Sequence, residues 1–265
     1  MRIGIHTGSR DADQIANECR QAGVSEVFLG TGAIPDLDRD KLKAFKDELM
    51  DRGISLSGMI IPVPTKDAVL GNNETEVDRL CKMLSAIGKA GVGTALFYPL
   101  DSFILFKEDR PLKPILDVKT EGEEWDQIIK FFKRIADVAE KANLKIANHV
   151  WDVELLRKIW DTVGSPNIGV TYCQGMYIIG EEPHSAVERL GVDRIFFCHA
   201  RNLIRHGVGF PGHEEVPLDK GDVSIAQCVK SLAKAGYDGL IIPEHLGSGD
   251  IAEAVNYLRS LISQA

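Results

Sequence analysis

Four side chains that commonly bind metals occur in the second half of the chain. His149, Cys173, His199 and Glu244 are 24, 26 and 45 residues apart, and each stands where a short apolar run ends. Two imidazoles, a thiolate and a carboxylate suit Mn, Fe, Co or Zn, whereas Mg and Ca prefer oxygen ligands. A clustered thiolate and carboxylate also need a cation to offset their repulsion. The four residues therefore predict a divalent-metal site.

Eight apolar segments that alternate with segments of helical period would position these ligands. The predicted strands are 2–6, 25–29, 54–61, 94–98, 144–149, 167–172, 194–198 and 239–243. This alternation is typical of βα units around a parallel sheet, which right-handed crossovers close into a barrel. We therefore expect an α/β fold, a single (β/α)8 TIM barrel over residues 1–265. Its last four strand ends would bring the ligands to one point at the mouth.

The predicted helices have one apolar face and small-residue ends. In the segment after the fourth strand, apolar residues recur three or four positions apart from Trp125 to Ala139, which predicts one buried face. Gly23, Gly53, Gly91 and Gly236 are expected to end helices in the left-handed conformation. Two long connections, 98–123 and 200–221, follow the fourth and seventh strands and should lie at the mouth, where barrels carry binding loops.

Composition narrows the class of partner. The formal net charge is -8, and no segment gathers Lys and Arg into the stripe that nucleic-acid binding requires. No apolar run approaches the length of a membrane span, and Met1 is followed directly by a predicted strand without a signal sequence. Five cysteines without CxxC spacing are typical of free thiols in a reducing compartment. We expect a cytoplasmic protein that binds neither nucleic acid nor membrane; a homo-oligomer is possible.

Several motifs of the chain resemble the sugar isomerase, epimerase and dehydratase superfamily of xylose isomerase-like TIM barrels, which includes endonuclease IV. The segments that carry the resemblance are Ile61 to Gly71, Ala147–His149, Tyr172–Gly175, His199–Asn202, His213 to Val223 and Pro243–Gly247. Within the superfamily the chain is most similar to mannonate dehydratases, because epimerases would carry Glu at Ala147 and Asp at Cys173. This resemblance implies Mn bound by His, Cys, His and Asp, and this chain departs from it with the longer Glu244 in the last place. It also implies a catalytic Tyr after the eighth strand, where this chain has Leu246–Gly249 and no Tyr.

The resemblance implies a metal-dependent lyase that removes water from a sugar acid, D-mannonate or a relative. His245 is then the candidate general base or acid, although beside Glu244 it could instead point outward into the helix layer. Arg201 could bind the substrate carboxylate through its planar fork, or lie unpaired at the surface. Asn202 is the candidate partner of a sugar hydroxyl. His213 is a second proton donor or a solvated loop residue, and His6 is a weaker candidate for the pocket floor.

Other functions stay open at this point. A metal-dependent isomerase or epimerase of a ketose or inosose, working through an enediolate, would use the same metal and proton-transfer groups. A barrel that only binds a sugar derivative is a further alternative. An endonuclease is disfavoured by the acidic charge balance and by too few additional His and Glu ligands. Cys198, one residue from His199 and so on the opposite face of the strand, is expected to be a core thiol.

Overall fold

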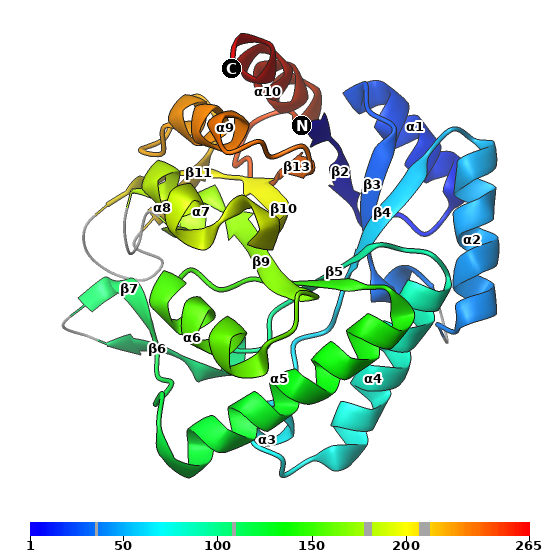
Figure 1. Ribbon diagram of the computed structural model, residues 1–265. Coiled ribbons are helices and arrows are strands. Elements are labelled where there is room, and N and C mark those ends of the chain that lie inside the picture. The colour runs from blue at the N-terminus through cyan, green and yellow to red at the C-terminus, as the bar shows by residue number, and fades with distance from the viewer. Residues whose placement is uncertain (35–36, 108–109, 178–181, 207–212) are drawn as a thin grey trace.

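The computed structural model describes residues 1–34, 37–107, 110–177, 182–206 and 213–265. A parallel sheet in the order β1-β13-β10-β9-β8-β5-β4-β3-β2 forms its centre (Figure 1). The strands are β1 Arg2–Ile3, β2 Ile5–Thr7, β3 Glu26–Gly30, β4 Ser55–Ile60, β5 Thr94–Phe97, β8 Lys145–Asn148, β9 Ile168–Cys173, β10 Ile195–Ala200 and β13 Leu240–Pro243. Because β1 and β2 are consecutive pieces of one strand, pairing with β13 and β3 respectively, the ring closes. The predicted (β/α)8 barrel is confirmed.

Helices surround the strands (Figure 1). They are α1 Ala12–Ala22, α2 Arg39–Asp51, α3 Lys66–Val69, α4 Glu74–Lys89, α5 Gly122–Ala142, α6 Val153–Val163, α7 Gln174–Tyr177, α8 Pro183–Leu190, α9 Ile225–Lys234 and α10 Ile251–Gln264; the 3-10 turns are η1 Thr31–Ala33, η2 Asp101–Phe103 and η3 Val192–Arg194. Side chains that accept backbone N–H groups start seven of the helices in the described residues, among them Asp11, Asn73 and Asp250. The four predicted terminal glycines have positive φ, and the predicted face of α5 is buried.

The core has two layers. Inside the barrel, six buried side chains pack together: Phe28, Leu96, Ala147, Phe197, Leu240 and Ile242. The rings of Phe28 and Phe197 stack with their centroids 4.3 Å apart. Gly58 makes room for them, because a Cβ there would lie 2.0 Å from the Phe28 ring. A larger layer, which includes the buried Cys198, lies between strands and helices, as predicted for that thiol.

Both long connections contain antiparallel hairpins. Strands β6 Ile104–Lys107 and β7 Arg110–Leu116 pair after β5, and the hairpin protrudes at the left of Figure 1. Strands β11 Asn202–Arg205 and β12 His213–Val216 pair after β10. The second hairpin therefore carries Asn202 and His213 on adjacent strands and returns the chain to the barrel mouth.

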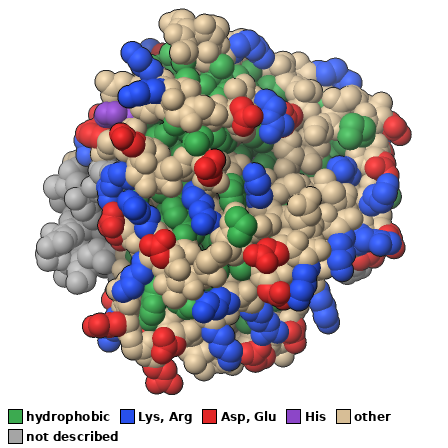
Figure 2. Space-filling model, in the orientation of Figure 1, with side chains coloured by type: hydrophobic (Ala, Val, Ile, Leu, Met, Phe, Trp, Pro, Cys, Tyr) green, Lys and Arg blue, Asp and Glu red, His purple; other side chains and the backbone are tan. Residues whose placement is uncertain are grey.

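The length of the helices and the distribution of surface charge relate to the expectation that the chain binds neither membrane nor nucleic acid. Within the described ranges, no helix is both long and apolar enough to cross a bilayer. On the face drawn in Figure 2, acidic and basic side chains are interspersed rather than separated.

Candidate functional site

The four predicted ligands meet at the mouth of the barrel. One ligand atom from each of His149, Cys173, His199 and Glu244 lies within 4.8 Å of the others. Cys173 Sγ is 3.4 Å from Glu244 Oε1, and His199 Nδ1 is 3.0 Å from the same oxygen. Three of the four side chains are buried and Glu244 is mostly so. The convergence predicted from strand ends is present.

Strand pairing explains this convergence. His199 on β10 is directly opposite Cys173 on β9, so their side chains point to the same face of the sheet. The ladder also continues one residue past β8 and β13. The backbone N–H of His149 donates to Phe97 O at 2.8 Å, and that of Glu244 donates to Ala200 O at 3.0 Å. All four ligands are thus held by regular backbone.

The arrangement fits a metal ion. Bond lengths of about 2.0–2.3 Å in a tetrahedral site separate neighbouring ligand atoms by about 3.3–3.8 Å, close to the distances between Glu244 Oε1 and its two neighbours. His199 Nδ1 is buried without a hydrogen-bond partner although Glu244 Oε1 is near. A buried nitrogen without a hydrogen-bond partner, next to a carboxylate oxygen and a thiol, would be satisfied by a bound cation. The cluster can therefore hold a divalent cation.

Burial sets the protonation of the cluster. Burial, together with neighbouring His199, lowers the pKa of His149 to about 3, which leaves the imidazole neutral and able to ligate. Burial and the Glu244 charge raise the pKa of the Cys173 thiol far above its usual range. Burial alone would raise the pKa of Glu244, but the adjacent imidazoles of His199 and His149 lower it overall. A bound cation would take the place of the thiol proton.

His6 supports the cluster from below. Its Nε2 lies 3.0 Å from Nε2 of His199, and its ring meets Phe28 and Phe197 edge-on. Burial and His199 lower the pKa of His6 to about 3, so the neutral ring can accept a hydrogen bond from the Nε2–H group of His199. Since Nε2 of His199 is engaged by His6, Nδ1 is its free ligand atom. The structure thus places His6 next to a predicted metal ligand. Its place at the floor of a substrate pocket stays a prediction.

Arg201 is buried and held by the second hairpin. Its Nε donates to both carboxylate oxygens of Glu215, at 3.1 and 3.2 Å, and its Nη2 donates to Oε1. Nη1 makes no hydrogen bond within the described residues. Gly175 leaves room for this side chain, because a Cβ there would lie 2.8 Å from Arg201 Cγ. His213 Nε2 is 3.2 Å from Glu215 Oε1, so His213 joins the same group.

The expected contact between Asn202 and a sugar hydroxyl is corrected by the structure. The Asn202 side chain is 1% exposed. Its amide nitrogen donates to the backbone carbonyls of Leu218 and Val223, and its oxygen accepts from the N–H groups of Leu203 and Val223. Both donor hydrogens and both acceptor positions are used. Asn202 therefore fastens the hairpin to the chain that follows it.

His245 lies at the solvent side of the cluster. It is one of two non-glycine residues of positive φ in the described chain, at 50°, and its side chain is 55% exposed. Its Nε2 is 3.8 Å from Glu244 Oε2. The strained turn thus presents the imidazole beside the ligand carboxylate, away from the packed helix layer, where it can exchange a proton with a bound molecule.

Two residues at the site were not predicted. Glu215, which holds Arg201 and His213, lies in the His213 to Val223 segment that carries part of the resemblance, but it was not singled out there as a site residue. Tyr98, the last residue of a predicted strand, lies with its ring centroid 4.7 Å from that of His149. The strand-end rule that located the ligands could have identified Tyr98 as well.

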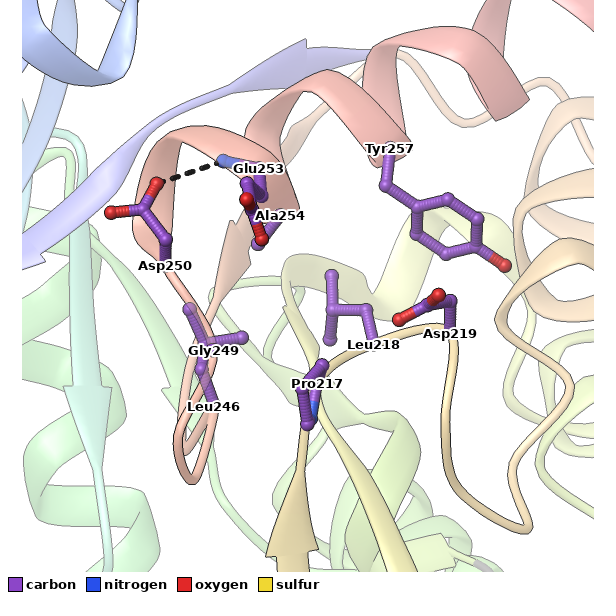
Figure 3. A pocket seen from close by; sticks show the side chains of 9 residues that line it. All are labelled: Pro217, Leu218, Asp219, Leu246, Gly249, Asp250, Glu253, Ala254 and Tyr257. Atoms are coloured by element: carbon purple, nitrogen blue, oxygen red, sulfur yellow. Dashed lines mark hydrogen bonds between the residues drawn. The ribbon is translucent and has the colours of Figure 1, made fainter.

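A separate pocket of about 140 Å³ lies between residues 217–219 and the start of α10 (Figure 3). Asp219, Asp250 and Glu253 contribute carboxylates to its wall, and Asp250 accepts from the backbone of Glu253 at 3.0 Å. Tyr257 lies on this wall, on α10, facing Asp219. It is therefore apart from the metal cluster and does not replace the Tyr that the dehydratase resemblance expects after the eighth strand.

Known proteins resemble both the sequence and the fold. Mannonate dehydratase from Streptococcus agalactiae serotype V is 28% identical over 157 residues, which are 51% of this chain and 44% of the relative. The match thus spans less than half of that relative. The structure of mannonate dehydratase from Streptococcus suis serotype 2 aligns with a TM-score of 0.76 and 16% identity, covering 100% of this chain and 94% of the other.

Epimerases share the fold as well. D-Psicose 3-epimerase from Clostridium cellulolyticum H10 aligns with a TM-score of 0.73 and 14% identity, covering 99% of each chain. The model of the family described as xylose isomerase-like TIM barrel matches residues 16–261. That range includes the four-ligand cluster and all but the first strand of the barrel, and the chain therefore belongs to the xylose isomerase-like TIM barrel family.

Proposed function

We propose that the chain is a metal-dependent hydro-lyase of the mannonate dehydratase type, which converts D-mannonate or a related sugar acid to a 2-keto-3-deoxy acid. The observation that carries this proposal is the buried Arg201 beside the four-ligand cluster. Glu215 occupies one edge of its guanidinium, and Nη1 has no acceptor among the described residues. A fixed cation with a free donor suits a carboxylate better than a neutral sugar. The similarity to mannonate dehydratases supports the same choice.

The reaction removes a proton from C2 and the hydroxyl from C3, and the resulting enol becomes the 2-keto group. Arg201 binds and orients the substrate carboxylate. His245, exposed beside Glu244, takes the C2 proton, and His213, held by Glu215, protonates the departing hydroxyl so that it leaves as water. The neutral His6 keeps His199 in one orientation through its 3.0 Å contact.

His149, Cys173, His199 and Glu244 would hold the cation, for which Mn is our first choice and Zn, Fe or Co are alternatives. A divalent metal there would supply Lewis-acid stabilisation of the negative charge that develops when C2 loses its proton.

The experiment is incubation of the Mn-loaded protein with D-mannonate and detection of 2-keto-3-deoxygluconate. His245→Asn should lower kcat about 10²–10⁴-fold without loss of metal, because it removes a proton-transfer group but no ligand. His184→Asn, on α8 and outside the cluster, is the matched control and should leave the rate unchanged. Absence of the keto-deoxy acid from the metal-loaded protein would reject the proposal.

An isomerase or epimerase is the second candidate, and one observation favours it. The segment Leu246–Gly249 after the eighth strand has no Tyr, where the dehydratase resemblance expects one. Such an enzyme would move a proton between neighbouring carbons without losing water. Incorporation of solvent deuterium into a ketose, without formation of a keto-deoxy acid, would select this alternative. No incorporation into any tested sugar or sugar acid would favour a protein that only binds its ligand.

A further inference from the structure

Tyr98 lies beside the four-ligand cluster, against His149. It directly follows β5, so its backbone is fixed at the barrel mouth next to the strand that carries His149. The two rings are 4.7 Å apart at their centroids and tilted by 43°. The phenol ring therefore packs against one of the predicted metal ligands.

The hydroxyl of Tyr98 differs from those of the fully buried tyrosines. Tyr172, Tyr177 and Tyr237 each donate to a backbone carbonyl, of Pro183, Val150 and Leu240 respectively, at 2.5–3.0 Å. Tyr98 is half-buried, and within the described part of the chain its hydroxyl has no hydrogen-bond partner. The hydroxyl is not among the buried polar atoms that lack a partner, so it remains accessible to a bound molecule. Packing against His149 would need only the ring.

Charged groups surround this hydroxyl. Burial raises the pKa of Tyr98 well above its usual range, and Glu244, Cys173 and Asp101 raise it further while Arg201 opposes them. The phenol oxygen is thus within electrostatic reach of two ligands of the cluster and of the guanidinium that would bind the carboxylate. A molecule held between the cluster and Arg201 would have its oxygens in reach of the phenol.

We propose that Tyr98 is a further catalytic residue, whose hydroxyl donates a hydrogen bond to a ligand oxygen held at the four-residue cluster. The inference rests on the proposed function in that it requires an oxygen-rich molecule there. It extends to either a sugar acid or a ketose, since both present hydroxyl and carbonyl oxygens. A Tyr from the fourth strand of the barrel would then supply the hydroxyl that is absent from the loop after the eighth.

The test compares wild type, Tyr98→Phe and Tyr257→Phe as Mn-loaded proteins. Oxalate is the first probe, because its binding by calorimetry needs no turnover and supplies four oxygens. Tyr98→Phe should bind oxalate about 10- to 100-fold more weakly, which corresponds to one lost hydrogen bond to a charged oxygen. Its metal content and Tm should equal those of wild type, because the ring that packs on His149 remains. Tyr257→Phe, in the separate pocket, should match wild type in every measurement.

Turnover of D-mannonate is measured on the same three proteins. Failure of wild type to turn it over, with oxalate binding still dependent on Tyr98, would reject the dehydratase proposal and leave the Tyr98 inference standing. Equal oxalate affinity in wild type and Tyr98→Phe would overturn the inference, as would the absence of oxalate binding by the Mn-loaded wild type.

Discussion

The most decisive prediction concerns the two neighbouring thiols Cys173 and Cys198. Both are buried, at 1% and 0% exposure, and they lie on paired strands, but only Cys173 faces the cluster. Replacing either by Ala removes a similar volume from the interior, so both variants should lose about 1 kcal/mol of stability from the small cavity. Only Cys173→Ala should lose the response to metal.

The size of that response follows from ligand binding to the folded state. At a metal concentration about 100 times Kd, binding stabilises the fold by about 2.7 kcal/mol. For a chain of this size that corresponds to a rise in Tm of about 5–10 °C. Mutation of groups that only orient metal ligands lowers metal affinity by about 10–100-fold. Loss of a ligand itself should therefore reduce metal affinity at least about 100-fold. The rise should therefore nearly vanish in Cys173→Ala and persist in Cys198→Ala.

The assay is thermal unfolding of each protein with and without Mn or Zn, together with metal analysis after dialysis. Wild type and Cys198→Ala should retain one metal per chain. If Cys173→Ala retains the same stoichiometry and the same rise in Tm, the ligand assignment is wrong.

Three further outcomes are expected. Glu215→Gln should raise KM for a sugar acid about tenfold or more at unchanged metal content, because Arg201 loses the charge that fixes it. Steady-state kinetics check this, and Glu214→Gln, whose side chain contacts His206 and not Arg201 within the described ranges, should leave KM unchanged. Burial raises the pKa of Asp101 to about 6 from 3.8, so ionising it opposes folding as pH rises through that range. Asp101→Asn should therefore be more stable by about 1–2 kcal/mol at pH 7, discounted for partial exposure, with no gain below pH about 4 in denaturant titrations. Gly58→Ala should lose about 1–3 kcal/mol, because its Cβ would collide with the Phe28 ring; an unchanged Tm would contradict the packing.

The barrel and its ligand set could be predicted because both depend on local pattern. Apolar runs of strand length, helical periods and terminal glycines are properties of short segments, and all eight predicted strands are present. In a closed parallel barrel, carboxyl ends of strands necessarily meet at one face. The positions of His149, Cys173, His199 and Glu244 at those ends therefore fixed their meeting point. The same rule placed Cys198 on the opposite face.

Residues in the long connections followed no such rule. Pairing of β11 with β12 brings Glu215, with its strand neighbour His213, to Arg201, although nothing in the period of that segment indicates the pairing. The return of the chain at Leu218 and Val223 uses every hydrogen-bonding position of Asn202. Such contacts depend on the path of the backbone between distant positions.

The sequence by itself determined the architecture and the four converging ligands, because hydrophobic periodicity and the positions of strand ends are properties of short segments of the chain. Tertiary structure decided which other side chains reach them. The tertiary structure exposes His245 to solvent at a residue of positive φ, pairs one edge of the Arg201 guanidinium with Glu215, and packs Tyr98 against His149. These outcomes depend on backbone path and rotamer, which packing between elements far apart in the chain selects.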